Sequence, residues 1–241
     1  MGRITEAIKH LIIITVIFFA IPQLMQLDLN QYFALYFPKN ENFRIWQYVT
    51  HIFMHGGFMH IAFNMYALWA FGTPLEQMWG RNKFLFFYFS AGIGAGIIYT
   101  LVNYYQFNSI YEQLINMGIS GSDIQAILDS GRYNDAIISL SNEEMSKFYS
   151  LYHTPAIGAS GAVYGVLVAF GMSFPNAKLA LIFFPVPIAA KYFIPVILLG
   201  DLFFGVTKYS VGNIAHFAHI GGAIIGFIIA WYWKKNQFRT Q

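Results

Sequence analysis

The chain has 241 residues, of which 57% are hydrophobic and only 10% are charged. Soluble domains carry about 25% charged residues, so lipid rather than water must surround much of this chain. The net charge of +3 is too small to indicate a nucleic-acid partner, and the absence of cysteine excludes disulfides, thiolate metal sites and cysteine nucleophiles. Apolar segments recur from end to end, which favours a single membrane domain over residues 1–241.

Six apolar segments approach the length of about 20 residues that a helix needs to cross a bilayer. They cover residues 8–25, 58–73, 84–104, 158–174, 192–206 and 213–233. The first resembles a secretory signal but lacks a small-x-small cleavage site, so we interpret it as a span. The segment 179–190 is apolar but short and contains Pro185 and Pro187, which favours a loop or interfacial segment. The sequence therefore predicts an all-α, six-helix, polytopic membrane protein.

The distribution of charge predicts the orientation. Six spans place both termini on one side. If that side is cytoplasmic, nine basic and two acidic residues lie inside, and five basic and nine acidic residues lie outside. Lys and Arg near span ends resist translocation, so we expect both termini in the cytoplasm. The short N-terminus without a transit peptide favours a bacterial inner membrane.

Residues 106–154 interrupt the apolar pattern with a polar, acidic stretch. Two capping boxes are predicted within it, Ser122 with Gln125 and Ser141 with Glu144. Apolar residues then recur at helical spacing, which indicates short amphipathic helices. We expect this insert on the outer face, between the third and fourth spans. It is too short to bury a large core alone and should pack on the membrane domain.

The fourth span opens with Ser160 between small residues, including Gly158 and Gly161. Small neighbours leave the hydroxyl accessible, and the free N–H groups of a helix start can stabilise an oxyanion. Tyr164 lies one turn later on the same face. An alternative is a helix-packing motif, because Gly161 and Gly165 have the G-x-x-x-G spacing. This segment alone does not choose between a nucleophile and a packing motif.

The sixth span carries His219, Gly222 and Gly226 on one face. Two glycines beside a histidine let a partner backbone approach closely. A helix with glycines at Gly161 and Gly165 would dock there and bring Ser160 towards His219. The alternative is a buried histidine that hydrogen-bonds a carbonyl group.

The second span begins with His60 and Asn64, one turn apart. Neutral imidazole and carboxamide groups are suitable oxyanion donors in a site of low dielectric constant. Zinc ligation by His55, His60 and Asn64 is the alternative. The sequence has no H-E-x-x-H helix and no carboxylate nearby, so we predict no metal.

All three clusters lie at the outer ends of their spans, and together they resemble the rhomboid family of intramembrane serine proteases from about Trp46 to Gly226. The matching strings are His55-x4-His60-x3-Asn64, Gly158-x-Ser160-Gly161 with Tyr164, and Ala218-His219-x2-Gly222-x3-Gly226.

The resemblance implies a catalytic dyad of Ser160 and His219. It also implies an oxyanion hole formed by His60, Asn64 and the Ser160 backbone N–H. Tyr164 would support the His219 ring, and His55 would stabilise the first outer loop.

The chain departs from the family pattern in two places. Trp46-Gln47 stands where the family commonly has Trp-Arg, so the usual anchor of the first outer loop is missing. The insert is longer than in compact members, and its position before Ser160 suggests that it covers the outer mouth and affects substrate access. Asp201 could form a triad, but nothing in the sequence links it to His219. His216 is expected on a different face, without a catalytic role.

The expected function is therefore cleavage of transmembrane segments of single-span or multi-span proteins near the outer face, without a cofactor. A helix-breaking segment is the expected substrate, because the carbonyl groups of an intact helix are already hydrogen-bonded. A transporter is the main alternative, but it predicts internal pseudo-symmetry, and we find none. The second alternative is an inactive relative that only binds membrane proteins, although such relatives typically lack the nucleophile or the base.

Overall fold

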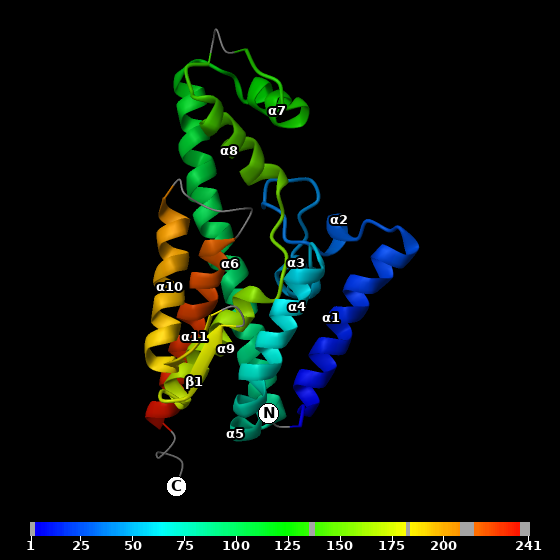
Figure 1. Ribbon diagram of the computed structural model, residues 1–241. Coiled ribbons are helices and arrows are strands. Elements are labelled where there is room, and N and C mark those ends of the chain that lie inside the picture. The colour runs from blue at the N-terminus through cyan, green and yellow to red at the C-terminus, as the bar shows by residue number, and fades with distance from the viewer. Residues whose placement is uncertain (1–2, 135–137, 182–183, 208–214, 237–241) are drawn as a thin grey trace.

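The computed structural model describes residues 3–134, 138–181, 184–207 and 215–236, and it consists mainly of helices (Figure 1). The helical elements are α1 (Glu6–Met25), α2 (Asn30–Phe33), α3 (Gln47–Thr50), the 3₁₀ turn η1 (His51–Phe53), α4 (Phe58–Ala67), the π-helical turn η2 (Leu68–Gly72), α5 (Thr73–Trp79), α6 (Arg81–Asn116), α7 (Gly121–Ser130), α8 (Asn142–His153), α9 (Ser160–Ser173), α10 (Ala190–Val206) and α11 (His216–Asn236). The prediction of an all-α membrane bundle is confirmed.

Each predicted span coincides with a helix. Of the described residues, α1, α6 and α11 form helices long and apolar enough to cross a bilayer, and α9 is a shorter apolar helix. The second predicted span continues without a break through α4, η2 and α5. Residues 213 and 214 of the last predicted span lie outside the described residues. The chain is thus a multi-pass integral membrane protein, while the six crossings remain a prediction.

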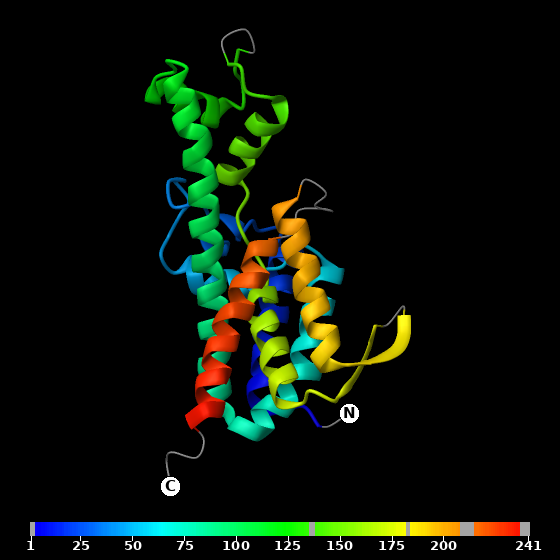
Figure 2. The same cartoon turned by 90° about the vertical axis from the view of Figure 1, so that its left-hand side faces the viewer.

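A short hairpin joins α9 to α10 and was not foreseen as strands. Strands β1 (Lys178–Leu181) and β2 (Phe184–Ala189) pair antiparallel, with Lys178 opposite Ala189. The hairpin projects to one side of the bundle (Figure 2). The prediction that this apolar segment is not a membrane helix is correct.

Helix α9 lies at the centre of the bundle because its surface is small enough for close packing on several sides. It contacts α6, α10 and α11, and nine of its 14 residues are buried. A Cβ added to Gly226 would lie 2.5 Å from the Cα of Gly165, and one added to Gly222 would overlap the Gly161 carbonyl group. The predicted docking of the two glycine faces is therefore present, and it brings the backbones of α9 and α11 into direct contact.

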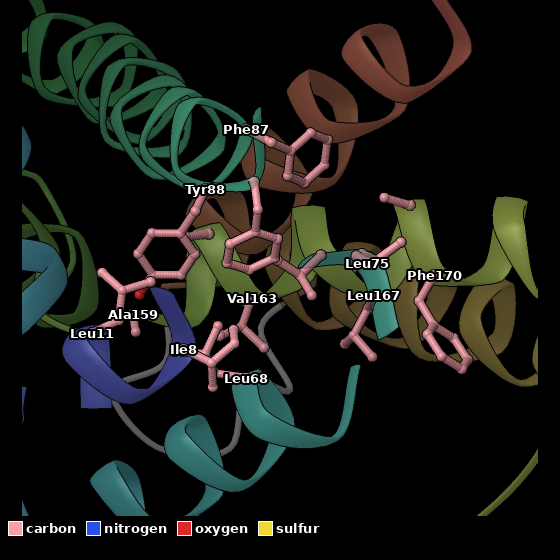
Figure 3. Close-up of a cluster of buried hydrophobic side chains, with 14 of the residues drawn as sticks. Ile8, Leu11, Leu68, Leu75, Phe87, Tyr88, Ala159, Val163, Leu167 and Phe170 are labelled. Atoms are coloured by element: carbon pink, nitrogen blue, oxygen red, sulfur yellow. The ribbon is translucent and has the colours of Figure 1, made fainter. Parts of the chain in front are cut away.

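The largest hydrophobic cluster surrounds α9 and extends to α1 and α6. Phe87, Tyr88 and Leu68 are fully buried in it and pack near Val163 and Leu167 of α9 (Figure 3). This core holds the helices that carry the three polar clusters in a fixed arrangement, so it sets the geometry of any site built at their ends.

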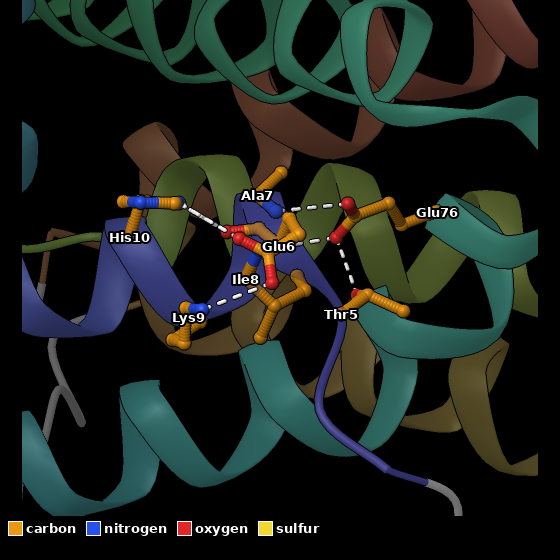
Figure 4. Close-up of polar contacts among 7 residues, drawn as sticks. All are labelled: Thr5, Glu6, Ala7, Ile8, Lys9, His10 and Glu76. Atoms are coloured by element: carbon orange, nitrogen blue, oxygen red, sulfur yellow. Dashed lines mark hydrogen bonds and ion pairs between the residues drawn. The ribbon is translucent and has the colours of Figure 1, made fainter.

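Glu76 in the middle of α5 holds the N-terminus of α1. Its carboxylate accepts hydrogen bonds from the backbone N–H groups of Ala7 (2.8 Å) and Ile8 (3.1 Å) and from the Thr5 hydroxyl (Figure 4). The first N–H groups of a helix have no partner within the helix, and a carboxylate there also interacts favourably with the helix dipole. Much of α1 is otherwise exposed, as expected of a helix that faces lipid.

The insert between the third and fourth predicted spans builds a second, smaller core. Helix α6 has 36 residues, which corresponds to about 54 Å at 1.5 Å per residue, well beyond a hydrocarbon core of about 30 Å. Its C-terminal end meets α7 and α8 in a cluster of buried residues: Phe37, Phe107, Ile110, Leu114, Ile124, Leu128, Ile138, Met145, Phe148 and Tyr152. The predicted end of the third span near Tyr104 is therefore not the end of the helix. The insert is helical and packs on a membrane helix, as expected.

One of the two predicted capping boxes is present. Ser141 and Glu144 cap α8 reciprocally, and the hydrogen bonds from Ser141 keep the pKa of Glu144 below its usual value. The box predicted for Ser122 and Gln125 is wrong, because Ser120 caps α7 and accepts the Asp123 N–H (3.2 Å). The chain enters this helix two residues earlier than the sequence pattern indicated.

Gln47 organises the loop before α4, where the family anchor is missing. Its fully buried amide accepts the N–H groups of Tyr36 (3.2 Å) and Arg44 (3.1 Å). The same amide donates to the carbonyl oxygens of Asn42 (2.8 Å) and Gln31 (3.4 Å). Four bonds satisfy a buried carboxamide completely, so the loop has an anchor of its own.

Candidate active site

Ser160 is the first residue of α9, and the segment before it is held in an extended form. Leu35 and Ala156 exchange two backbone hydrogen bonds of 2.9 and 2.8 Å, and the Gly158 N–H donates to the His51 carbonyl oxygen (2.9 Å). Gly158 has φ +122°, a conformation that a side chain disfavours. These contacts fix the position at which the chain enters α9 and hence the position of the Ser160 hydroxyl.

The structure brings Ser160 and His219 together from opposite sides of the α9–α11 contact. The Ser160 Oγ lies 2.8 Å from the His219 Nε2. The His219 ring stacks on the Tyr164 ring with their centroids 4.2 Å apart and their planes within 11°. A hydroxyl that donates to an imidazole nitrogen is the arrangement of a serine nucleophile and its base. The close approach follows from Gly161 and Gly222, which remove the side chains between the two backbones.

His60 and Asn64 face the same cavity as the Ser160–His219 pair. A Cβ added to Gly158 would lie 2.8 Å from the His60 Nε2 and 3.6 Å from the Ser160 Oγ, which places the imidazole beside the serine. The Asn64 Nδ2 donates one hydrogen to the His60 carbonyl oxygen (2.9 Å) and keeps a second. Both side chains can therefore offer a donor near the Ser160 hydroxyl.

His55 lies behind His60 rather than in the cavity. The two rings meet edge to face with their centroids 4.8 Å apart. The His55 Nδ1 lies 3.3 Å from the Phe53 carbonyl oxygen, and its Nε2 accepts the Ala159 N–H at 3.5 Å. His55 thus ties the loop before α4 to the residue that precedes Ser160.

A cavity of about 1300 Å³ connects these residues with the insert. Its walls come from α4, α8, α9 and the facing ends of α10 and α11. The polar side chains that line it are those of Asp28, Asn30, Tyr36, His60, Asn64, Tyr99, Asn103, Gln106, Glu143, Lys147, Ser150, Thr154, Ser160, Tyr164, Thr207, His216 and His219. The insert therefore borders the space in front of the serine.

Asp201 corrects two sequence-based expectations. Its Oδ1 lies 3.1 Å from the His219 Nδ1 and 2.6 Å from the His216 Nδ1, and its Oδ2 accepts the Tyr164 hydroxyl. The expectation that nothing links Asp201 to His219 is wrong. So is the expectation that His216 uses a different face, because both imidazoles reach one carboxylate. Asp201 is the only acidic residue within the six predicted spans, and a lone carboxylate there is itself a signal of function.

The same three side chains are the candidate metal ligands in the part of the chain that the structure describes. One ligand atom each from Asp201, His216 and His219 lies within 4.8 Å of the others. The site is compact because both imidazoles already hydrogen-bond the carboxylate, so the cluster has an explanation without an ion. The zinc site considered at His55, His60 and Asn64 has no carboxylate in contact with it among the described residues.

The chain is similar in sequence to known proteins over most of its length. The model of the Rhomboid domain matches residues 42–236. The chain is 30% identical over 185 residues to "Rhomboid protein 1, mitochondrial" of Saccharomyces cerevisiae, covering 76% of this chain and 40% of that protein. It is 30% identical over 186 residues to "Rhomboid protease GluP" of Bacillus subtilis, covering 77% and 25%.

A human relative extends the set. "Presenilin-associated rhomboid-like protein, mitochondrial" is 27% identical over 191 residues, which cover 77% of this chain and 38% of that protein. The chain thus spans at most about two fifths of the length of these three relatives. The match of the family model covers most of the chain, including Ser160, His219, His60, Asn64 and Asp201. The chain belongs to the rhomboid family.

Proposed function

We propose that this chain is an intramembrane serine endopeptidase that cleaves transmembrane segments of membrane proteins near the outer face by a Ser160–His219 mechanism. The contact of 2.8 Å between the Ser160 Oγ and the His219 Nε2 carries the proposal. The name of the Bacillus relative, a rhomboid protease, supports it. Both groups open onto a cavity large enough for an extended peptide segment.

The reaction follows from the position of each group. His219 Nε2 takes the proton of the Ser160 Oγ as that oxygen attacks the scissile carbonyl carbon. His60, Asn64 and the Ser160 N–H donate to the oxygen that becomes negative. His219 then protonates the leaving amine, and a water molecule, deprotonated by the same imidazole, hydrolyses the acyl-enzyme. Tyr164 keeps the imidazole plane fixed through ring stacking.

The proposed substrates are single-span or multi-span proteins whose helix is weak near the outer face. A helix in lipid satisfies its own carbonyl groups, so a peptide bond becomes available only where the helix unwinds.

We further propose that both termini are cytoplasmic, that the insert is extracytoplasmic and that the membrane is a bacterial inner membrane. Basic residues at the ends of α1 and α11 and at the start of α6 support this orientation. A C-terminal tag that proteases digest from outside intact cells would contradict it.

Cleavage of a single-span reporter with a helix-breaking segment tests the proposed activity. Purified wild-type protein in detergent is expected to cut the reporter, and Ser160→Ala or His219→Ala is expected to lower the rate by at least about 10³-fold. Ser173→Ala, at the other end of the same helix, is the matched control and should keep the wild-type rate. Equal cleavage by Ser160→Ala would show that another group is the nucleophile. Failure to cut any of a panel of such reporters would favour a protein that only binds membrane partners.

A further inference from the structure

Asp201 is one of two carboxylates that are buried in the described part of the chain, the other being Glu76. A carboxylate within a membrane helix is costly unless it has partners. Glu76 is explained by the N-terminus of α1, which it caps. Asp201 caps no helix terminus, because it lies five residues before the end of α10. Its role must therefore come from the side chains around it.

The hydrogen bonds of Asp201 determine the tautomer of His219. An ionised carboxylate only accepts hydrogen bonds, so the His219 Nδ1, 3.1 Å from the Asp201 Oδ1, carries the hydrogen. The Nε2 of the neutral ring then has its lone pair free and faces the Ser160 Oγ at 2.8 Å. This is the tautomer in which His219 can act as the base.

The same carboxylate also fixes the ring on which His219 stacks. Its Oδ2 accepts the Tyr164 hydroxyl, while the Tyr164 ring lies parallel to the imidazole. Asp201 thus fixes the His219 ring in two ways. It accepts a hydrogen bond from the ring directly, and it holds Tyr164, on which the ring stacks. His216 donates to the same Oδ1 from the first turn of α11 and holds the carboxylate in place.

We propose that Asp201 is the positioning residue of the catalytic base, which it holds as the Nδ1–H tautomer and whose imidazolium it stabilises during the reaction. The proposal rests on the proposed peptidase function. Asp201 does not line the cavity, and its hydrogen bonds go to His219, His216 and Tyr164, so it acts through His219. A negative charge close to a histidine that gains a proton in the transition state lowers the barrier.

The kinetic test compares Asp201→Asn with Glu76→Gln. Each variant replaces a buried carboxylate by its amide, and Glu76 contacts the start of α1, away from Ser160. For Asp201→Asn we expect kcat to fall by about 10²-fold with KM changed less than about twofold, because the imidazolium loses its counter-charge. Glu76→Gln should keep the wild-type kcat per folded protein. An Asp201→Asn variant that folds and keeps the wild-type kcat would overturn the proposal.

A second measurement does not depend on cleavage. The ring nitrogens of ¹⁵N-histidine-labelled protein report the tautomer of His219, whose signals are identified by their loss in His219→Gln. We expect the Nδ1–H form in the wild type and its loss in Asp201→Ala, whereas Glu76→Gln should leave it unchanged. Retention of the Nδ1–H form in a folded Asp201→Ala variant would overturn the proposal. If the wild type cut no reporter, the proposed function would fail, and this spectrum would still decide the role of Asp201.

Discussion

Single residues decide how closely the two halves of the site approach one another. Gly222 faces Gly161 across the α9–α11 contact, one turn from His219, and a Cβ there would overlap the Gly161 carbonyl oxygen. Because that oxygen belongs to backbone, it cannot move without moving α9. The distance between Ser160 and His219 therefore depends on the absence of a side chain at position 222.

Gly222→Ala is expected to lower stability and activity together. Overpacking of this kind costs about 1–3 kcal/mol, and the separation of the helices would lengthen the contact between Ser160 and His219. The control is Gly200→Ala in α10, where an added Cβ has nothing within 4 Å. Alanine is also the better helix former, so this control should melt at or slightly above the wild-type temperature. Thermal unfolding in detergent makes the comparison, and equal melting of Gly222→Ala and wild type would refute this reading of the interface.

Single residues also show where the sequence predicts a contact correctly and where it does not. The spacing of Gly161, Gly165, Gly222 and Gly226 sufficed to pair α9 with α11, because small residues at that spacing have few other uses in a membrane helix. Gln47 was interpreted as a missing anchor, yet its buried amide makes four hydrogen bonds. Its partners lie in an irregular loop, where periodicity gives no information about which groups meet.

At the scale of elements, hydropathy predicted where the helices lie but not where they end. All six predicted segments coincide with helices, but α6 continues past Tyr104 to Asn116, because a helix that leaves the membrane changes its surface and not its backbone. The lateral placement of α10 against α11 has no signature in either segment alone. The link between Asp201 and His219 was missed for that reason.

Helix α8 is the element of the insert that borders the cavity in front of Ser160. Glu143 and Lys147, both exposed, line that cavity from α8. A substrate whose segment outside the membrane passes between α8 and α4 would meet these charges. We therefore expect the insert to affect substrate binding rather than the chemical step.

Lys147→Glu should raise KM for a reporter with acidic residues just outside its membrane segment. An exposed ion pair contributes about 0.2–1 kcal/mol, so KM should rise about 1.4- to 5-fold, with kcat unchanged. Glu112→Lys, an exposed charge on α6 that does not line the cavity, is the control and should leave KM unaltered. Initial rates over a range of reporter concentrations in detergent provide both constants. An unchanged KM for Lys147→Glu would contradict a role of the insert in substrate binding.

For the molecule as a whole, the arrangement separates a closely packed centre from more loosely attached peripheral elements. The α9–α11 contact and the core around α9 place Ser160, His219 and Tyr164. Helix α1 is held by Glu76 and by its own buried residues in that core, and the C-terminal end of α6 carries the insert. A protease that must cut within a membrane needs its reacting groups fixed and a side open to the bilayer. The fold would meet the first need, because the glycine contacts hold the two helices that carry Ser160 and His219 directly against each other.

Covalent labelling tests whether Ser160 is a nucleophile activated by His219. A fluorophosphonate reacts only with an activated serine, so mass spectrometry of the digested wild-type protein should find one adduct, on the peptide that contains Ser160. The Ser160→Ala and His219→Ala variants should remain unlabelled, while Ser173→Ala should label at the wild-type rate. Absence of an adduct on the folded wild-type protein, or an adduct on a different serine, would contradict the account.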